Sequence, residues 1–285
     1  MLFTRYTFLK KMFWLFLGMS MLHAADTNTT SSTTTMTRIM PLGDSLTYDN
    51  TYADDEKPRP SSQRAGYRSH LWYMLKDANY TADFVGSQVA GQGIKPPFDP
   101  DNEGHPGWTS FDIAEKVYAS LIIQQPDIVL LHAGTNDHTT APSGIESILN
   151  QIDYYEENSG KTVRVIVALL MDRRDADGRI PIFNGRLKKL VDSRIIKGDD
   201  LLLVDMYNGA RISNSHYVDP THPDSFGYRR MAQVWFNALI APYNKALRLF
   251  PATIVNRTYI KSISFNDAAN SVTFTTELPN TGITF

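Results

Sequence analysis

The chain has 285 residues, of which 42% are hydrophobic, and this suits one sizeable folded core and excludes disorder of the whole chain. Its 28 basic and 30 acidic residues give a formal net charge of −2, so it lacks the basic excess with which proteins bind nucleic acid. We therefore expect no nucleic-acid partner. No cysteine occurs, so stability must come from core burial and not from disulfide bonds.

Residues 1–24 have the pattern of a secretory signal peptide. Basic residues stand among the first 11 positions, an apolar run follows over residues 12–22, and residues 22–24 weakly fit the A-x-A cleavage pattern. An apolar run of about 11 residues is too short to span a bilayer. We expect cleavage after this segment, a secreted extracellular protein and no stable membrane insertion.

The next segment, residues 25–37, reads "ADTNTTSSTTTMT" and is expected to be a flexible Ser/Thr-rich linker. The main domain is expected over residues 38–250. In it, short runs that are apolar throughout alternate with longer segments, and such runs suit strands covered on both faces. The predicted strands are residues 39–42, 84–85, 128–131, 163–170 and 201–204.

The longer segments have helical spacing: in one of them Ile113, Val117 and Leu121 recur every four residues. Strands alternating with helices predict an α/β fold, a three-layer α/β/α sandwich around a five-stranded parallel sheet. In such sheets the ligand binds beyond the carboxyl ends of the strands. The predicted helices are residues 66–79, 111–124, 143–155, 181–196 and 225–243.

The last segment, residues 251–285, alternates apolar and polar residues instead. Ile263 and Phe265 are separated from Val272 and Phe274 by the turn-rich "NDAAN". This pattern predicts a short C-terminal β-hairpin. Two strands alone are marginal in water, so we expect the hairpin to dock on the main domain or to begin a further β module.

A serine stands where the first predicted strand ends, in the stretch "MPLGDSLTYD". Ser45 thereby falls at the ligand edge of the sheet, and its hydroxyl needs a base to become a nucleophile. Among the histidines, His132 lies in an apolar strand and is expected to be a satisfied core residue. His222 follows Asp219 by three residues in "VDPTHPDSFGY", a spacing at which the carboxylate reaches Nδ1. Alternatively, Asp219 caps a turn and His222 is merely exposed.

Acyl transfer also needs hydrogen-bond donors aimed at the developing oxyanion. Asn136 in "HAGTND" follows the third predicted strand and offers a side-chain amide, and Gly107 in "EGHPGWTS" allows a backbone N–H to approach a ligand closely. Each alone is explained by a turn or a helix cap. Compatible pieces at three separate strand ends favour one site.

Together these residues resemble the SGNH or GDSL-type hydrolases. The family's blocks match "GDSL" at 43–46, the glycine of "PGWT", "GTND" at 134–137 and "DPTH" at 219–222, in the family's order. The resemblance implies a flavodoxin-like fold with Ser45 as nucleophile. It also implies an oxyanion hole made by the backbone N–H groups of Ser45 and Gly107 and the side chain of Asn136.

A narrower resemblance is to the secreted acetylxylan esterases of carbohydrate esterase family three. It rests on "RIMPLGDSLT", "GYRSHLW", "DFVGS", "EGHPGWT", "PDIVLLHAGTND" and "DPTHPDSFGYRRMAQVW". It implies removal of acetyl groups from plant cell-wall xylan, without cofactor or metal, by an expected monomer. The family often has isoleucine where this chain has Leu46, and the insert at 48–68 bears on substrate shape.

Four residues near the motifs are candidate contacts for an acetylated polysaccharide or other small ester substrate. Tyr48, Tyr67 and Trp108 offer aromatic faces that suit sugar rings, and Asp44 adjoins the nucleophile. Trp72 lies in a helical pattern, where packing is the better explanation.

Other functions remain open. Within the same family, a lipase or thioesterase would act on non-carbohydrate esters. A metal-dependent deacetylase would recruit His132, His138, His216 and His222, but the compact H-E-x-x-H type of ligand spacing is absent. A catalytically silent carbohydrate-binding protein is the third alternative, which intact Ser45 and the other motif residues argue against.

Overall fold

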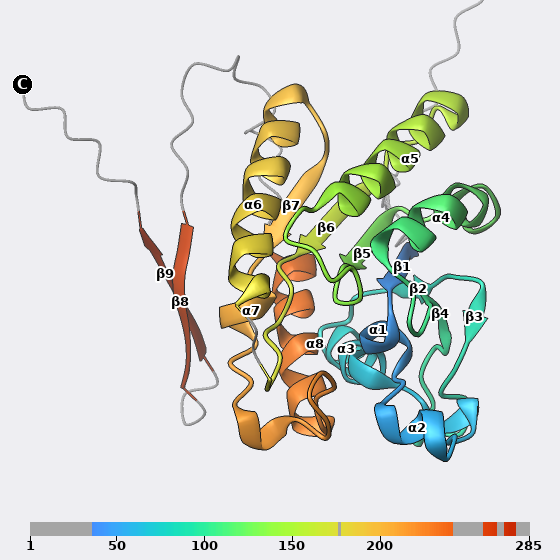
Figure 1. The fold of residues 1–285 in the computed structure, drawn as a ribbon, viewed down its shortest axis with the longest axis vertical. Coiled ribbons are helices and arrows are strands. Elements are labelled where there is room, and N and C mark those ends of the chain that lie inside the picture. The colour runs from blue at the N-terminus through green and yellow to red at the C-terminus, as the bar shows by residue number, and fades with distance from the viewer. Residues whose placement is uncertain (1–35, 176–177, 242–258, 267–270, 278–285) are drawn as a thin grey trace, which may run out of the picture. The chain divides into compact units, whose positions relative to one another are not determined.

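A computed structural model describes residues 36–175, 178–241, 259–266 and 271–277, drawn in Figure 1. The predicted signal peptide, residues 1–24, lies outside the described residues, as does the predicted linker up to residue 35. The first strand begins at Thr37, one residue before the predicted start of the main domain.

The central sheet is mostly parallel and is ordered β3-β4-β1-β5-β6-β7, with β2 pairing beside β4 on the same edge of β1. Every pair is parallel except β3 with β4. The strands are β1 (Thr37–Gly43), β2 (Ala82–Phe84), β3 (Gln88–Val89), β4 (Asp101–Gly104), β5 (Ile128–His132), β6 (Arg164–Ala168) and β7 (Leu201–Val204).

The α/β class with helices on both faces of a mostly parallel sheet is confirmed, but the count of five strands was wrong. The five predicted apolar runs fall on β1, β2, β5, β6 and β7. Strands β3 and β4 are additional: β4 reads Asp-Asn-Glu-Gly, so no apolar run announces it. It pairs with the end of β1 at Leu42 and Gly43, while β2 pairs with the beginning.

Helices cover both faces of the sheet, and the five long ones coincide with the predicted helices to within a few residues (Figure 1). Helices α4, α5 and α6 pack on one face, and α3 and α8 pack on the other. The helices are α1 (Ser45–Tyr48), α2 (Tyr52–Glu56), α3 (Gly66–Asp77), α4 (Ser110–Gln124), α5 (Ser143–Ser159), α6 (Arg179–Lys197), α7 (Met206–Gly209) and α8 (Ser225–Ile240).

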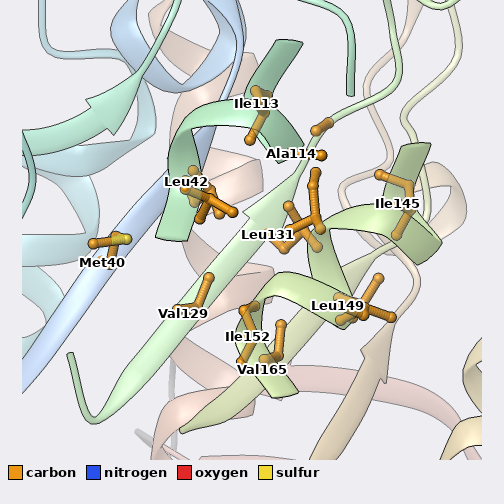
Figure 2. Packing of buried hydrophobic residues seen from close by; sticks show 14 of the residues in the cluster. Met40, Leu42, Ile113, Ala114, Val129, Leu131, Ile145, Leu149, Ile152 and Val165 are labelled. Atoms are coloured by element: carbon orange, nitrogen blue, oxygen red, sulfur yellow. The ribbon is translucent and has the colours of Figure 1, made fainter. Parts of the chain in front are cut away.

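Alternate side chains of the inner strands point to opposite, covered faces of the sheet, which explains why β1, β5 and β6 contain runs that are apolar throughout. On β5, Val129 and Leu131 join the core under α4 and α5, whereas Leu130 joins the core under α3 and α8. Figure 2 shows the first of these cores, with Met40 and Leu42 of β1 packed in the same cluster. Both cores hold the strands rigidly, so the carboxyl ends of the strands are fixed relative to one another.

Near the C-terminus, β8 (Tyr259–Asn266) pairs antiparallel with β9 (Ser271–Glu277), with a register shift between Ile260 and Ser262. The turn between them, residues 267–270, lies outside the described residues. Across the ranges that the structure describes, no helix combines the length and apolar character needed to cross a membrane.

Candidate active site

Ser45 is placed at the carboxyl edge of the sheet by a sharp turn from strand to helix. Strand β1 ends at Gly43, and Asp44 then caps α1 by accepting a hydrogen bond from the Leu46 N–H at 3.0 Å. A Cβ at position 43 would lie 2.2 Å from the carbonyl oxygen of His132 on β5. Only glycine allows this approach of the two strands, so Gly43 lets the serine follow the strand directly.

Ser45, His222 and Asp219 form a continuous hydrogen-bonded chain. The Ser45 Oγ lies 2.8 Å from His222 Nε2, and His222 Nδ1 lies 2.8 and 2.9 Å from the two oxygens of Asp219. Both the serine and the histidine are buried, and they are 177 positions apart in the chain. This geometry lets the histidine accept the serine proton while the carboxylate orients the ring.

Asp219 is held in its ionised form by the loop around it. Burial alone would raise its pKa, but the backbone N–H groups of Tyr52, His222 and Thr221 donate to the carboxylate and, with the charge of His222, hold the pKa below its ordinary value. Their hydrogen bonds measure 2.9, 2.8 and 2.8 Å respectively. An ionised carboxylate accepts a hydrogen bond from Nδ1–H and so leaves Nε2 free to act on the serine.

Gly107 lies in a turn beside the nucleophile. The Trp108 N–H donates to the His105 carbonyl at 3.2 Å, and Gly107 has φ +79°, which together with Pro106 before it describes a type II turn. The turn uses the N–H of Trp108 and leaves that of Gly107 outside its own hydrogen bond. Because the His105 N–H donates to the Gly43 carbonyl at 2.9 Å, the turn is tied to the strand that carries Ser45.

Asn136 is joined to the same turn. Its side-chain amide donates to the Trp108 carbonyl at 2.9 Å, and an amide nitrogen has a second hydrogen to offer. The adjacent Asp137 accepts from the N–H and hydroxyl of Ser110 at 2.7 and 2.5 Å, which fixes this loop against the start of α4. The segments that follow β1, β4 and β5 are thus linked to one another at the carboxyl edge of the sheet, where Gly107 and Asn136 are the candidate oxyanion donors.

Two of the predicted substrate contacts, Asp44 and Tyr67, are wrong, because both side chains are 0% exposed and cannot touch a polysaccharide. Asp44 directly precedes the nucleophile in the chain, and burial raises its pKa to about 6 despite the hydrogen bond from Leu46. Tyr67 belongs to the buried face of α3, and its hydroxyl lies 3.3 Å from the Thr47 Oγ1. Helical periodicity turns Tyr67 inward, and capping turns Asp44 toward the backbone.

The other aromatic candidates differ among themselves. Tyr48 and Trp108 are half-buried, and one face of the Trp108 ring stacks on His105 with centroids 3.9 Å apart. Trp72 packs its ring edge to face with Phe84 at 5.3 Å, in keeping with the packing expected from its helix. Tyr48 and Trp108 therefore remain candidate contacts, whereas Trp72 is explained by packing.

His132 is buried as expected, but it is not satisfied: neither ring nitrogen has a hydrogen-bond partner among the described residues. Burial lowers its pKa to about 4, so the ring stays neutral. His132 lies on β5, and an apolar sequence predicts burial of the ring but not whether its nitrogens find hydrogen-bond partners. Within residues 36–241 and the hairpin strands, as far as described, no group of three or more histidines or carboxylates could hold a metal ion.

One residue of the site was missed by the sequence reasoning. Tyr52, within the insert at 48–68, donates its backbone N–H to Asp219 at 2.9 Å and packs its ring edge-on against His222 with centroids 5.3 Å apart. Tyr52 and Asp219 are 167 positions apart, so only a three-dimensional structure or covariation among relatives would have revealed their contact.

No protein-family model matches the chain. The solved structure of a family 3 carbohydrate esterase from Clostridium thermocellum is 26% identical, with a TM-score of 0.59 over 71% of this chain and 94% of that one. A carbohydrate esterase family 3 structure from Talaromyces cellulolyticus is also 26% identical, with a TM-score of 0.61 over 72% of this chain and 97% of that one.

A curated relative is described as a multidomain esterase of Ruminococcus flavefaciens. It is 28% identical, and the match covers 71% of this chain. The matched part is 28% of the length of that relative. The likeness therefore concerns one region of a larger protein.

Proposed function

We propose that the chain is an SGNH/GDSL-type esterase close to carbohydrate esterase family 3. We propose further that it hydrolyses acetyl and other short acyl esters on plant cell-wall polysaccharide, with acetylxylan as the expected substrate. The observation that carries the proposal is the buried hydrogen-bonded chain from Ser45 through His222 to Asp219. The likeness to two family 3 carbohydrate esterases along nearly their whole length supports the ester class.

In the first half of the proposed reaction, the Ser45 Oγ attacks the acetyl carbonyl carbon while His222 Nε2 takes the serine proton. The carbonyl oxygen becomes an oxyanion, which the N–H groups of Ser45 and Gly107 and the amide of Asn136 stabilise. The ester bond then breaks, and the imidazolium gives its proton to the departing sugar oxygen. The sugar leaves with a free hydroxyl, and the acetyl group stays on Ser45.

In the second half, water replaces the sugar. His222 takes a proton from the water, whose oxygen attacks the acetyl-enzyme, and the same donors hold the second oxyanion. Collapse of this intermediate breaks the bond to Ser45, and the imidazolium returns its proton to the serine oxygen. Acetate leaves and the enzyme is restored, with Asp219 orienting the ring and stabilising its charge throughout.

Substrate and location form further parts of the proposal. Tyr48 and Trp108 are partly exposed beside the donors and are the proposed sugar contacts, since aromatic faces suit sugar rings. Residues 1–24 are proposed to direct export, because their basic start and apolar run have the signal-peptide pattern. An exported enzyme would meet plant polymers that cannot enter a cell.

The test compares the wild-type protein with Ser45→Ala, and with Ser193→Ala as a matched control on the exposed face of α6. Acetate release is measured on acetylated xylan, acetylated pectin, chitin fragments and long-chain p-nitrophenyl esters. We expect wild type and Ser193→Ala to release acetate from xylan, and Ser45→Ala to be inactive. Full activity in Ser45→Ala refutes the mechanism, and a preference for long-chain esters favours the lipase or thioesterase alternative.

A further inference from the structure

The insert at 48–68, whose role the sequence left open, folds into an ordered arm that includes α2. At the start of this helix, the N–H and hydroxyl of Thr51 donate to Asp54 Oδ2 at 2.8 and 3.0 Å. Arg59 then donates to the same carboxylate at 2.8 Å and to Asp49 at 3.1 Å. Asp54 is buried, and these partly buried charge-assisted bonds restrain the start of α2, whose first residue is Tyr52.

Tyr52 makes three contacts with the loop that carries the histidine. Its backbone N–H donates to Asp219 Oδ2 at 2.9 Å, and its hydroxyl lies 2.9 Å from the Thr221 Oγ1. Its ring meets the His222 ring at an interplanar angle of 83°, with centroids 5.3 Å apart. We propose that Tyr52 is a positioning residue for the Asp219–His222 pair, an inference that rests on the proposed function of the same site.

The two oxygens of Asp219 are held differently, which gives the Tyr52 N–H its importance. Oδ1 accepts from the backbone N–H groups of Thr221 and His222, both within the loop itself. Oδ2, which lies 2.8 Å from His222 Nδ1, accepts the N–H of Tyr52 from outside the loop. Oδ1 also lies 2.9 Å from His222 Nδ1, so the insert adds to the donors of the loop one that restrains the other oxygen and thereby the plane of the carboxylate relative to the imidazole.

The side chain of Tyr52 restrains the other half of the pair. The edge of an aromatic ring carries partial positive charge, and an edge-to-face contact prefers one orientation of the partner ring. Because the hydroxyl is tied to Thr221, the Tyr52 ring cannot swing away from His222 without losing that bond. The histidine is thus confined by the carboxylate on one side and by the tyrosine ring on another.

A purely structural role for Tyr52 is separable from positioning, because comparison of two variants that both lack the ring isolates the effect of its N–H. Proline is well accommodated at the first residue of a helix, where its fixed φ suits the helix. Thr51 has φ −110° and ψ 168°, the extended conformation that residues before proline adopt. Tyr52→Pro removes the ring and the N–H, whereas the matched control Tyr52→Ala removes the ring and keeps the N–H.

We expect kcat for p-nitrophenyl acetate to be about tenfold lower in Tyr52→Pro than in Tyr52→Ala, with KM unchanged, because a hydrogen bond to a charged group is lost. The acid limb of the pH profile should move to higher pH in Tyr52→Pro. With one donor fewer, the Asp219 carboxylate is less stabilised as an anion, so the Asp219–His222 pair binds a proton more tightly. Equal kcat and equal pH profiles in the two variants would overturn the proposal.

A second measurement covers the case in which Tyr52→Pro does not fold, which thermal unfolding would reveal. The proton on His222 Nδ1, shared with Asp219, gives a low-field resonance in proton NMR. We expect this resonance to shift or broaden in Tyr52→Ala and to change less in Tyr52→Phe, which keeps the ring. An unchanged resonance in Tyr52→Ala overturns the positioning role. The NMR result holds even if wild type shows no esterase activity, an outcome that would refute the proposed function alone.

Discussion

Asn136 offers a direct test of the oxyanion site. In Asn136→Ala the side-chain amide is lost, so one of the proposed donors to the tetrahedral intermediate disappears. Asn136→Asp keeps the shape but replaces the amide with a carboxylate, which cannot donate when ionised and repels an oxyanion. Both changes also remove the 2.9 Å hydrogen bond to the Trp108 carbonyl.

The magnitude follows from these two losses. Removal of one oxyanion donor lowers kcat by about 10²- to 10³-fold. Loss of the bond to the Trp108 carbonyl costs about 1 kcal/mol of unfolding free energy, because the carbonyl of this half-buried residue exchanges a protein donor for water. We therefore expect a large loss of kcat in a protein that remains folded, and a still larger loss in Asn136→Asp.

The assay is acetate release from p-nitrophenyl acetate, with urea unfolding measured on the same preparations. Asn184→Ala is the matched control: its amide joins the N–H and carbonyl of Leu170, at 2.8 Å each, and is buried. The control should lose more stability than Asn136→Ala and keep its kcat. If Asn136→Ala lost less than tenfold in kcat, or if Asn184→Ala lost as much as Asn136→Ala, the oxyanion assignment would be refuted.

Two further predictions concern stability. The pKa of Asp44 is about 6 in the folded protein against 3.8 ordinarily, so its contribution to stability is fully present below about pH 3.8 and is lost as the pH rises through 6. Asp44→Asn should therefore raise the unfolding free energy more at pH 8 than at pH 4, by up to about 3 kcal/mol. An equal change in unfolding free energy at the two pH values would contradict the burial argument. Gly43→Ala would place a Cβ 2.2 Å from the His132 carbonyl oxygen, so β1 and β5 would have to separate. Urea unfolding should show a loss of about 3 kcal/mol of unfolding free energy, or the variant should fail to fold. Near-wild-type stability would show that the two strands can move apart at little cost.

Much of the fold was predictable because it follows from local pattern. Strands buried on both faces must be apolar at successive positions, and β1, β5 and β6 show that pattern. Strand β7 is also apolar at successive positions, although its Leu202 is exposed. Strands β3 and β4 lack an apolar run and are short. Strand β4 forms because the end of β1 has a free edge with which this later segment of the chain pairs, and β3 then pairs with β4. Pairing of this kind depends on a distant strand, so no local signal exists.

The site divides in the same way. Acyl transfer requires a nucleophile, a base, a carboxylate that orients the base, and hydrogen-bond donors. Ser45 and Asn136 follow predicted strands and His222 follows Asp219 by three residues, so the sequence favoured these roles only when the motifs were taken together. Tertiary structure alone decided which neighbouring polar residues face outward: it buried Asp44 and Tyr67, and it brought Tyr52 to Asp219 across 167 positions. The reason is that a side chain's role follows from its chemistry, whereas its exposure and long-range partners follow from how the rest of the chain packs around it.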